Sequence, residues 1–169
     1  MTDWASAPTV IPDVDEVRRV LVALRYDQPL LVHPLTSLEA VREVVAREAV
    51  APGDTGRAWA LGVLIHELVD GQLEMAGRAA RVTPAAESSP VDRLVADFAA
   101  GSGELEVWSA LYHRYLDVAQ LTVGEIAAHV GMPRRTLGRR LAAAHRRLAQ
   151  ALGERDRDAR RRLVERPDG

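Results

Sequence analysis

The chain has 169 residues, of which 47% are hydrophobic and 27% charged, a balance that is typical of globular proteins and excludes a wholly disordered one. It contains no cysteine, so neither a disulfide framework nor a thiolate metal site can form. No run approaches the 18 or so apolar residues that a membrane span requires, and the N-terminus lacks the features of a signal peptide. We therefore expect a soluble cytoplasmic protein.

The formal net charge of −2 conceals an uneven distribution along the chain. Residues 1–132 contain 10 arginines and 19 acidic residues, whereas residues 133–169 contain 12 arginines and five acidic residues. Such an asymmetry indicates a polyanionic partner for the basic part. The acidic part would repel nucleic acid, so only the C-terminal part is expected to bind it.

The first half of the sequence predicts an acidic helical domain over residues 1–82, with a role in sensing or in binding protein partners. Apolar residues at helical spacing indicate helices from about Asp13 to Tyr26, from Leu38 to Ala49 and from Thr55 to Met75. We expect Thr36 or Ser37 to cap the second of these helices and Trp59 to lie on the buried face of the third. Residues 29–33 form either a strand fragment or an extended connector.

The second half of the sequence predicts further helices after a linker or exposed loop at residues 83–90, which are rich in proline, alanine and serine. Two helices are expected, from about Val91 to Ala99 and from Glu104 to about Asp117, with Trp108 and Tyr112 turned inward. The fold class is therefore all-α. It consists of a helical N-terminal domain followed by a helix-turn-helix domain at residues 91–169 with a basic C-terminal extension.

Residues 121–152 carry the clearest local signals. Thr122 and Glu125 form a capping box that begins a short helix, Gly131 can adopt the left-handed conformation that ends it, and Pro133 suits the first turn of a second helix. One stripe of the second helix is expected to face the core, namely Leu137, Leu141, Ala144 and Leu148. A helix, a tight turn and a second helix in this order predict a helix-turn-helix, whose second helix enters the major groove of DNA.

Six arginines and no acidic residue lie between positions 133 and 152. We assign base-edge contacts to Arg135 and Arg139, because arginine prefers a bidentate contact with guanine and the first turns of a recognition helix reach the bases. Phosphate contacts are assigned to the remaining candidates, which are Arg134, Thr136, Arg140, Arg146 and Arg147. Gly138 costs roughly 1 kcal/mol of helix stability relative to alanine, and either a close approach of the DNA backbone or tight packing would explain it.

The string L-T-x-x-E-I-A-x-x-V-G-M-P-x-x-T-L-x-x-R-L-x-x-A-x-x-x-L resembles region 4 of sigma factors, especially those of the extracytoplasmic-function group, and is similar to the related LuxR-type helix-turn-helix. The match runs from Trp108 to Leu152. In that family the second helix reads the −35 promoter element and the surrounding helices can touch RNA polymerase. The resemblance implies DNA contacts at Thr122, Pro133, Arg134, Arg135, Thr136, Arg139 and Arg140.

No other segment indicates chemistry. His66 and Glu67 imitate the start of a zinc-protease motif, but the second histidine of that motif is missing, and the other histidines are scattered. No phosphate loop, nucleophile elbow or carboxylate pair is present, so we expect no metal, no cofactor and no enzymatic activity. Residues 154–165 form either a mixed-charge helix extension or a frayed end, and a homodimer contact there is left open.

The sequence thus favours a sequence-specific DNA-binding regulator of transcription, with double-stranded DNA as its partner and RNA polymerase or another protein bound through the N-terminal domain. The alternative is a non-enzymatic adaptor in which the helix-turn-helix fold mediates protein–protein contacts.

Overall fold

The computed structural model describes residues 12–31, 33–83 and 88–165, and over these residues all regular elements are helices. The predicted all-α class is confirmed. The elements, in chain order, are α1 (Val14–Arg25), the 3-10 turn η2 (Pro34–Ser37), α2 (Glu39–Arg47), α3 (Asp54–Ala79), α4 (Pro90–Ala99), α5 (Gly103–Leu111), the π-helical turn η3 (Tyr112–Leu116), α6 (Val123–Val130) and α7 (Arg134–Glu165). None of the described helices is both long and apolar enough to cross a lipid bilayer.

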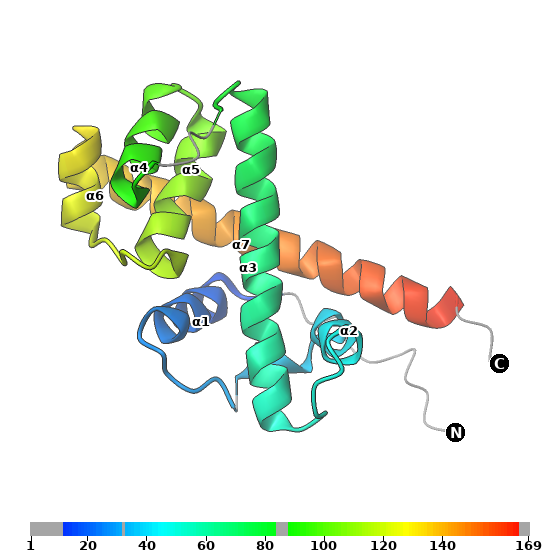
Figure 1. Cartoon of the computed structure of the whole chain (residues 1–169). Coiled ribbons are helices and arrows are strands. Elements are labelled where there is room, and N and C mark those ends of the chain that lie inside the picture. Colours follow the sequence, from blue (N-terminus) through cyan, green and yellow to red (C-terminus); the bar gives the residue numbers. More distant parts are fainter. Residues whose placement is uncertain (1–11, 32, 84–87, 166–169) are drawn as a thin grey trace.

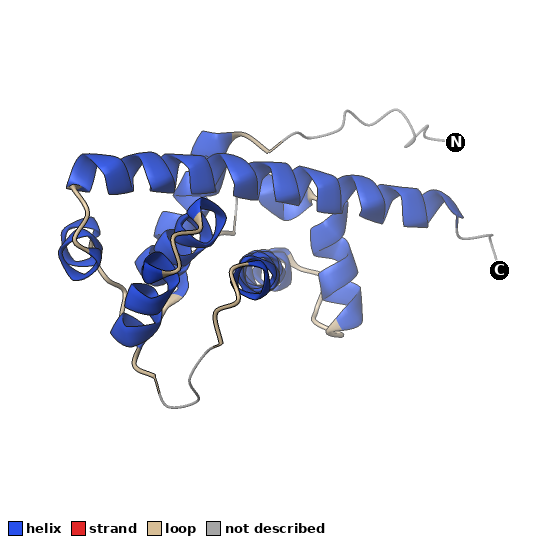
Figure 2. Ribbon diagram, turned by 90° about the horizontal axis from the view of Figure 1, so that it is seen from above, coloured by secondary structure: helices blue, strands red, loops and turns tan. Residues whose placement is uncertain are grey.

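The 32-residue helix α7 runs the length of the molecule and organises the other helices around it (Figures 1 and 2). Its N-terminal half lies beside α5 and α6, with α4 next to them. Its C-terminal half passes α3, α1 and α2. Residues 154–165 are therefore a helix extension, the first of the two alternatives that the sequence left open.

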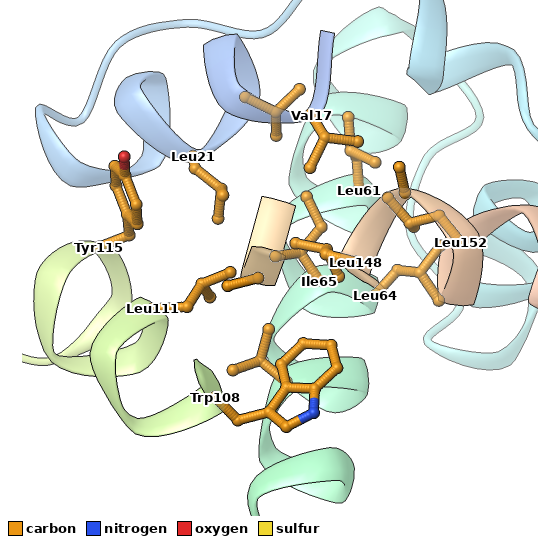
Figure 3. Close-up of a cluster of buried hydrophobic side chains, with 14 of the residues drawn as sticks. Val17, Leu21, Leu61, Leu64, Ile65, Trp108, Leu111, Tyr115, Leu148 and Leu152 are labelled. Carbon is orange, nitrogen blue, oxygen red and sulfur yellow. The ribbon is translucent and has the colours of Figure 1, made fainter. Parts of the chain in front are cut away.

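One continuous core joins the helices of the two halves of the chain (Figure 3). Leu21 of α1, Ile65 of α3, Leu111 of α5 and Leu148 of α7 are fully buried and lie together in this core, while Trp108 of α5 is 2% exposed. The predicted stripe of α7 is confirmed, because Leu137, Leu141, Ala144 and Leu148 are all buried. The N-terminal helices and α7 consequently depend on the same apolar contacts for their stability.

The N-terminus of α2 is capped from a distant part of the chain. Its N-cap residue Leu38 provides no side-chain hydrogen bond. Instead, the fully buried Asp156 of α7 accepts hydrogen bonds through Oδ1 from the backbone N–H groups of Glu39 (2.6 Å) and Ala40 (3.2 Å). The predicted cap by Thr36 or Ser37 is wrong, because the Thr36 hydroxyl donates to the carbonyl of His33 and the Ser37 hydroxyl to that of Pro34, each at 2.7 Å.

The prediction for Trp59 is also wrong: this residue of α3 is 48% exposed, whereas Trp108 is buried as predicted. The buried stripe of α3 follows Ala60, Leu61, Leu64 and Ile65. Trp59 precedes that stripe by one residue, a rotation of about 100° around the helix axis, and this leaves its ring at the edge of the core. Residues 29–31 and 33 form a connector rather than a strand.

Candidate nucleic-acid interface

The helix, tight turn and second helix predicted over residues 121–152 are present as α6, the turn at Gly131 and the N-terminal part of α7. The Thr122 hydroxyl accepts from the Glu125 N–H (3.2 Å), and the Glu125 carboxylate accepts from the Thr122 N–H (2.7 Å), which completes the capping box of α6. These hydrogen bonds also hold the pKa of Glu125 below its usual range. At the other end Gly131 is left-handed, with φ 65° and ψ 31°, so the chain turns sharply into α7.

Small and apolar residues hold α6 against its neighbours. Ile126 is fully buried and Ala127 is 5% exposed, and α6 contacts both α4 and the start of α7. A Cβ atom at position 124 would lie 2.7 Å from Nη2 of Arg134, so Gly124 provides the space in which this guanidinium lies across α6. Arg134 therefore lies where α6 meets α7.

Three of the predicted arginines share one exposed face of α7. Arg135, Arg139 and Arg146 are all exposed, and at 100° per residue they fall within about 40° of one another around the helix axis. Leu137, on the buried stripe, lies on the opposite side. Nη2 of Arg139 donates to Oγ1 of Thr136 at 3.4 Å, so this pair of candidates is in contact. We call Arg135, Arg139 and Arg146 the arginine face.

The other two arginines of this half pair with acidic residues of α5. Nε of Arg140 lies 2.9 Å from Oε2 of Glu106, and Arg147 forms an ion pair with Glu104. Glu104 is in turn positioned by Trp108, whose indole N–H donates to it at 2.8 Å. In the described part of the chain no acidic side chain pairs with the arginine face or with Arg134. Over the described ranges, the six predicted arginines thus divide into four without an acidic partner and two that are neutralised.

Gly138 is not required by packing against the residues that the structure describes. A Cβ atom placed there would have no neighbour within 4 Å, so of the two explanations offered by the sequence, tight packing against the described residues is excluded. Ala142, one turn later, is also exposed. Gly138 and Ala142 lie beside the arginine face and leave the helix backbone accessible to a partner there.

Arg25 is a positioning residue that the sequence analysis did not identify. Its guanidinium is buried at the end of α1 and donates to the carbonyls of Gln120 (2.7 Å), Leu121 (3.0 Å) and Arg114. The amide of Gln120 returns a hydrogen bond to the Arg25 carbonyl at 2.7 Å. These bonds fix the loop before α6 to α1. In the sequence Arg25 is only a basic residue in the last turn of a helix, which is too common a feature to predict this role.

The remaining predicted site features are placed as follows. Thr122 lies at the exposed start of α6, where its oxygen is an acceptor in the capping box. Over the residues that the structure describes, no three histidine, aspartate or glutamate side chains are grouped so that they could hold a metal ion. No family model, curated protein or solved structure matches the chain.

Proposed function

We propose that the chain is a sequence-specific DNA-binding regulator of transcription, non-enzymatic and cytoplasmic, that inserts the N-terminal half of α7 into the major groove. The observation that carries the proposal is the arginine face: Arg135, Arg139 and Arg146 project from one side of a helix, and no acidic side chain of the described residues pairs with them. Solvated helix faces usually mix charges of both signs. Arginine also makes the commonest base-specific contact in the major groove.

The roles of the individual residues follow from their positions. Arg135 and Arg139, on the first turns of α7, would read base edges. Arg134 at the junction of α6 and α7, Arg146 further along and Thr136 and Thr122 would contact phosphates. Arg140 and Arg147 would contribute only after leaving Glu106 and Glu104. The open space above Gly138 supports a close approach of the DNA backbone.

The salt dependence of binding tests this assignment quantitatively. Arg134 and Arg146 are the exposed arginines assigned to phosphates, and if each neutralises one phosphate, the slope of log K against log salt concentration is expected to be about −1.8. If Arg140 and Arg147 also engage phosphates, the slope steepens to about −3.6. A slope near zero, or no binding to any duplex at low salt, would contradict the proposal.

The decisive comparison uses two double variants with the same change in charge. A duplex selected from random sequence by the wild-type protein is the ligand, and fluorescence anisotropy is the measurement. Arg135→Ala with Arg139→Ala is expected to weaken binding by at least tenfold, because each lost guanine contact is worth about 1–3 kcal/mol. Arg155→Ala with Arg162→Ala is the control, since both of these arginines already pair with Glu43 and should leave affinity within about twofold. Equal losses of DNA affinity in the two variants would show that the arginine face contributes only its positive charge and makes no sequence-specific contact.

A second candidate function, that of a protein adaptor, is favoured by a different observation. The exposed Trp59 and Leu31 line a groove of about 590 Å³ between α3 and the segment after α1. Exposed tryptophan in a groove is typical of a surface that binds a protein, such as RNA polymerase or a second copy of the chain. If this is the main function, Trp59→Ser will abolish binding of the protein partner, whereas Arg135→Ala with Arg139→Ala will preserve it. Sedimentation of the wild type and Trp59→Ser identifies a homodimer.

A further inference from the structure

A cavity of about 520 Å³ lies between the second half of α3, α4 and the α5–η3 segment, on elements other than those that carry the arginine face. This volume is within the range of small-molecule sites. Its apolar lining includes Leu73 of α3, Ala96 of α4 and Leu105 of α5. Its polar lining includes Asp70, Asp97 and His113, which come from three different elements. The cavity therefore combines an apolar wall with a few polar groups, as ligand sites do.

The histidine that lines the cavity presents a hydrogen-bond acceptor. His113 is 2% exposed, and its Nδ1 lies 2.7 Å from Oδ2 of the buried Asp117. Since a carboxylate only accepts hydrogen bonds, Nδ1 carries the proton, and Nε2 is left with a lone pair. Burial lowers the pKa of His113, which favours this neutral form at neutral pH.

The carboxylates of the cavity add further acceptors. Oδ2 of Asp97 accepts a hydrogen bond from the buried Ser109 hydroxyl at 2.6 Å, and Oδ1 is left for a ligand. Burial raises the pKa of Asp97 and of Asp70, and the nearby Arg93 opposes the shift of Asp97 only in part. Both carboxylates would be stabilised in their charged form by a bound positive charge.

The two arginines that line the cavity do not balance its carboxylates. Arg78 pairs with Glu74, which leaves Arg93 as the one arginine of the described lining set against Asp70 and Asp97, and its Nε donates to the backbone carbonyl of Ser88 at 3.3 Å. The cavity thus has acceptors and negative charge in excess over donors and positive charge. An anionic ligand would meet repulsion from Asp70 and Asp97, whereas an ammonium group would replace missing counter-charge.

We propose that this cavity binds an organic cation, a primary amine attached to an apolar body. The ammonium group would donate hydrogen bonds to Oδ1 of Asp97 and to Nε2 of His113, and the apolar body would lie against Leu73 and Leu105. Binding of the amine does not require DNA binding, and it is tested by direct measurement of the binding of an amine to the chain. Because α4 also contacts α6, and α5 contacts α7, a ligand here would touch the elements that support the candidate DNA interface.

The test uses phenethylamine as the probe and the similarly sized anion 3-phenylpropionate as its counterpart, both titrated into the full chain by NMR or calorimetry. We expect saturable binding of phenethylamine and at least tenfold weaker binding of 3-phenylpropionate. Asp97→Asn is expected to weaken phenethylamine binding at least tenfold. Asp158→Asn, an exposed substitution on α7 with the same change in charge, is expected to leave it unchanged.

A second variant separates ligand binding from folding. Ala96→Phe fills the cavity without removing any polar group, so it should abolish binding while the thermal unfolding midpoint is retained. Saturation at the cavity in the wild type together with loss in Ala96→Phe supports the site even if Asp97→Asn does not fold. No saturable binding of phenethylamine up to 10 mM, equal binding of 3-phenylpropionate, or undiminished binding by folded Ala96→Phe would each overturn the proposal.

Discussion

The two halves of α7 have a similar content of arginine and use it differently. In residues 134–147 the side chains of Arg135, Arg139 and Arg146 lie in solvent. In residues 148–165 Arg155 and Arg162 pair with Glu43 of α2, Arg160 pairs with Asp156, and Arg161 pairs with Asp158. A run of positive charge along a helix therefore indicates a binding surface only where the fold supplies no acidic partner for it.

The difference arises from both the sequence and the packing. The second half of α7 contains acidic residues of its own, and it passes α2. The first half contains none, and among the residues that the structure describes the acidic ones that reach it come from α5 and neutralise only Arg140 and Arg147. The second half is thereby a structural element of the fold, and the first half is the part left available for a partner.

The strongest way to break this division is to remove the buried carboxylate of the second half. Asp156→Ala leaves the N–H groups of Glu39 and Ala40 without their acceptor and removes the partner of Arg160. Loss of a helix cap together with buried unsatisfied donors should lower the free energy of unfolding by about 3 kcal/mol. Urea denaturation measures this change. Asp158→Ala, which removes only an exposed ion pair, should stay within about 0.5 kcal/mol, and equal losses would contradict a structural role for Asp156.

The junction of the two halves provides a pH-dependent test. His145 is 8% exposed, packs against the ring of Tyr115 and has a pKa lowered to about 4 by burial and by Arg18 and Arg146. Above the ordinary pKa of 6.5 the residue is neutral in both states. Below pH 6.5 His145 is protonated in the unfolded chain but stays neutral in the folded chain. The free energy of unfolding therefore falls as the pH decreases from 6.5 to about 4.

Between pH 8 and pH 5 this residue should cost the wild type roughly 2 kcal/mol of unfolding free energy. His145→Met keeps an apolar side chain of similar size and should remove that part of the pH dependence. Urea denaturation of both proteins at pH 8 and pH 5 gives the difference. An equal decrease in the free energy of unfolding from pH 8 to pH 5 in the two proteins would show that His145 is already protonated in the folded state at pH 5.

The substitution of Gly138 by alanine has the smallest expected effect, and it should change stability and DNA binding in opposite directions. Gly138→Ala should raise the free energy of unfolding by up to about 1 kcal/mol, since glycine is a poor helix former and the new methyl group meets no neighbour within the described structure. The same methyl group should weaken DNA binding if the backbone of DNA approaches there. Gly71→Ala in α3, where a Cβ would likewise have no neighbour within 4 Å, is the matched control and should stabilise without affecting DNA. Unchanged DNA affinity in Gly138→Ala would show that the DNA backbone does not approach α7 closely at this position.

Sequence periodicity and capping signals were sufficient for the helices and for the turn at Gly131, because these depend on neighbours within a few residues. The observed ends of the helices differ from the predicted ones where contacts with distant residues determine them. The predicted helix up to Asp117 ends as α5 at Leu111 and continues as a π-helical turn, in which His113 and Tyr115 are buried. Likewise α2 begins without a local cap because Asp156 supplies one.

The candidate site was predictable as a set of residues but not as a surface. The spacing of Arg135 and Arg139 places them one turn apart, and the structure leaves both exposed. The pairing of Arg140 with Glu106 could not be foreseen, since it depends on how α5 packs against α7. For the same reason the sequence offered no sign that Asp97 and His113 line one cavity.

The long-range bonds of the N-terminal helices have a consequence for the order in which the chain is made. Asp156, which caps α2, is added to the growing chain 117 positions after Glu39. The residues whose carbonyls accept hydrogen bonds from the Arg25 guanidinium are added 89 to 96 positions after Arg25. When α1 and α2 leave the ribosome, their partners have not yet been synthesised. Their final packing therefore waits for α7, so the helices made first are among the last to reach their native contacts.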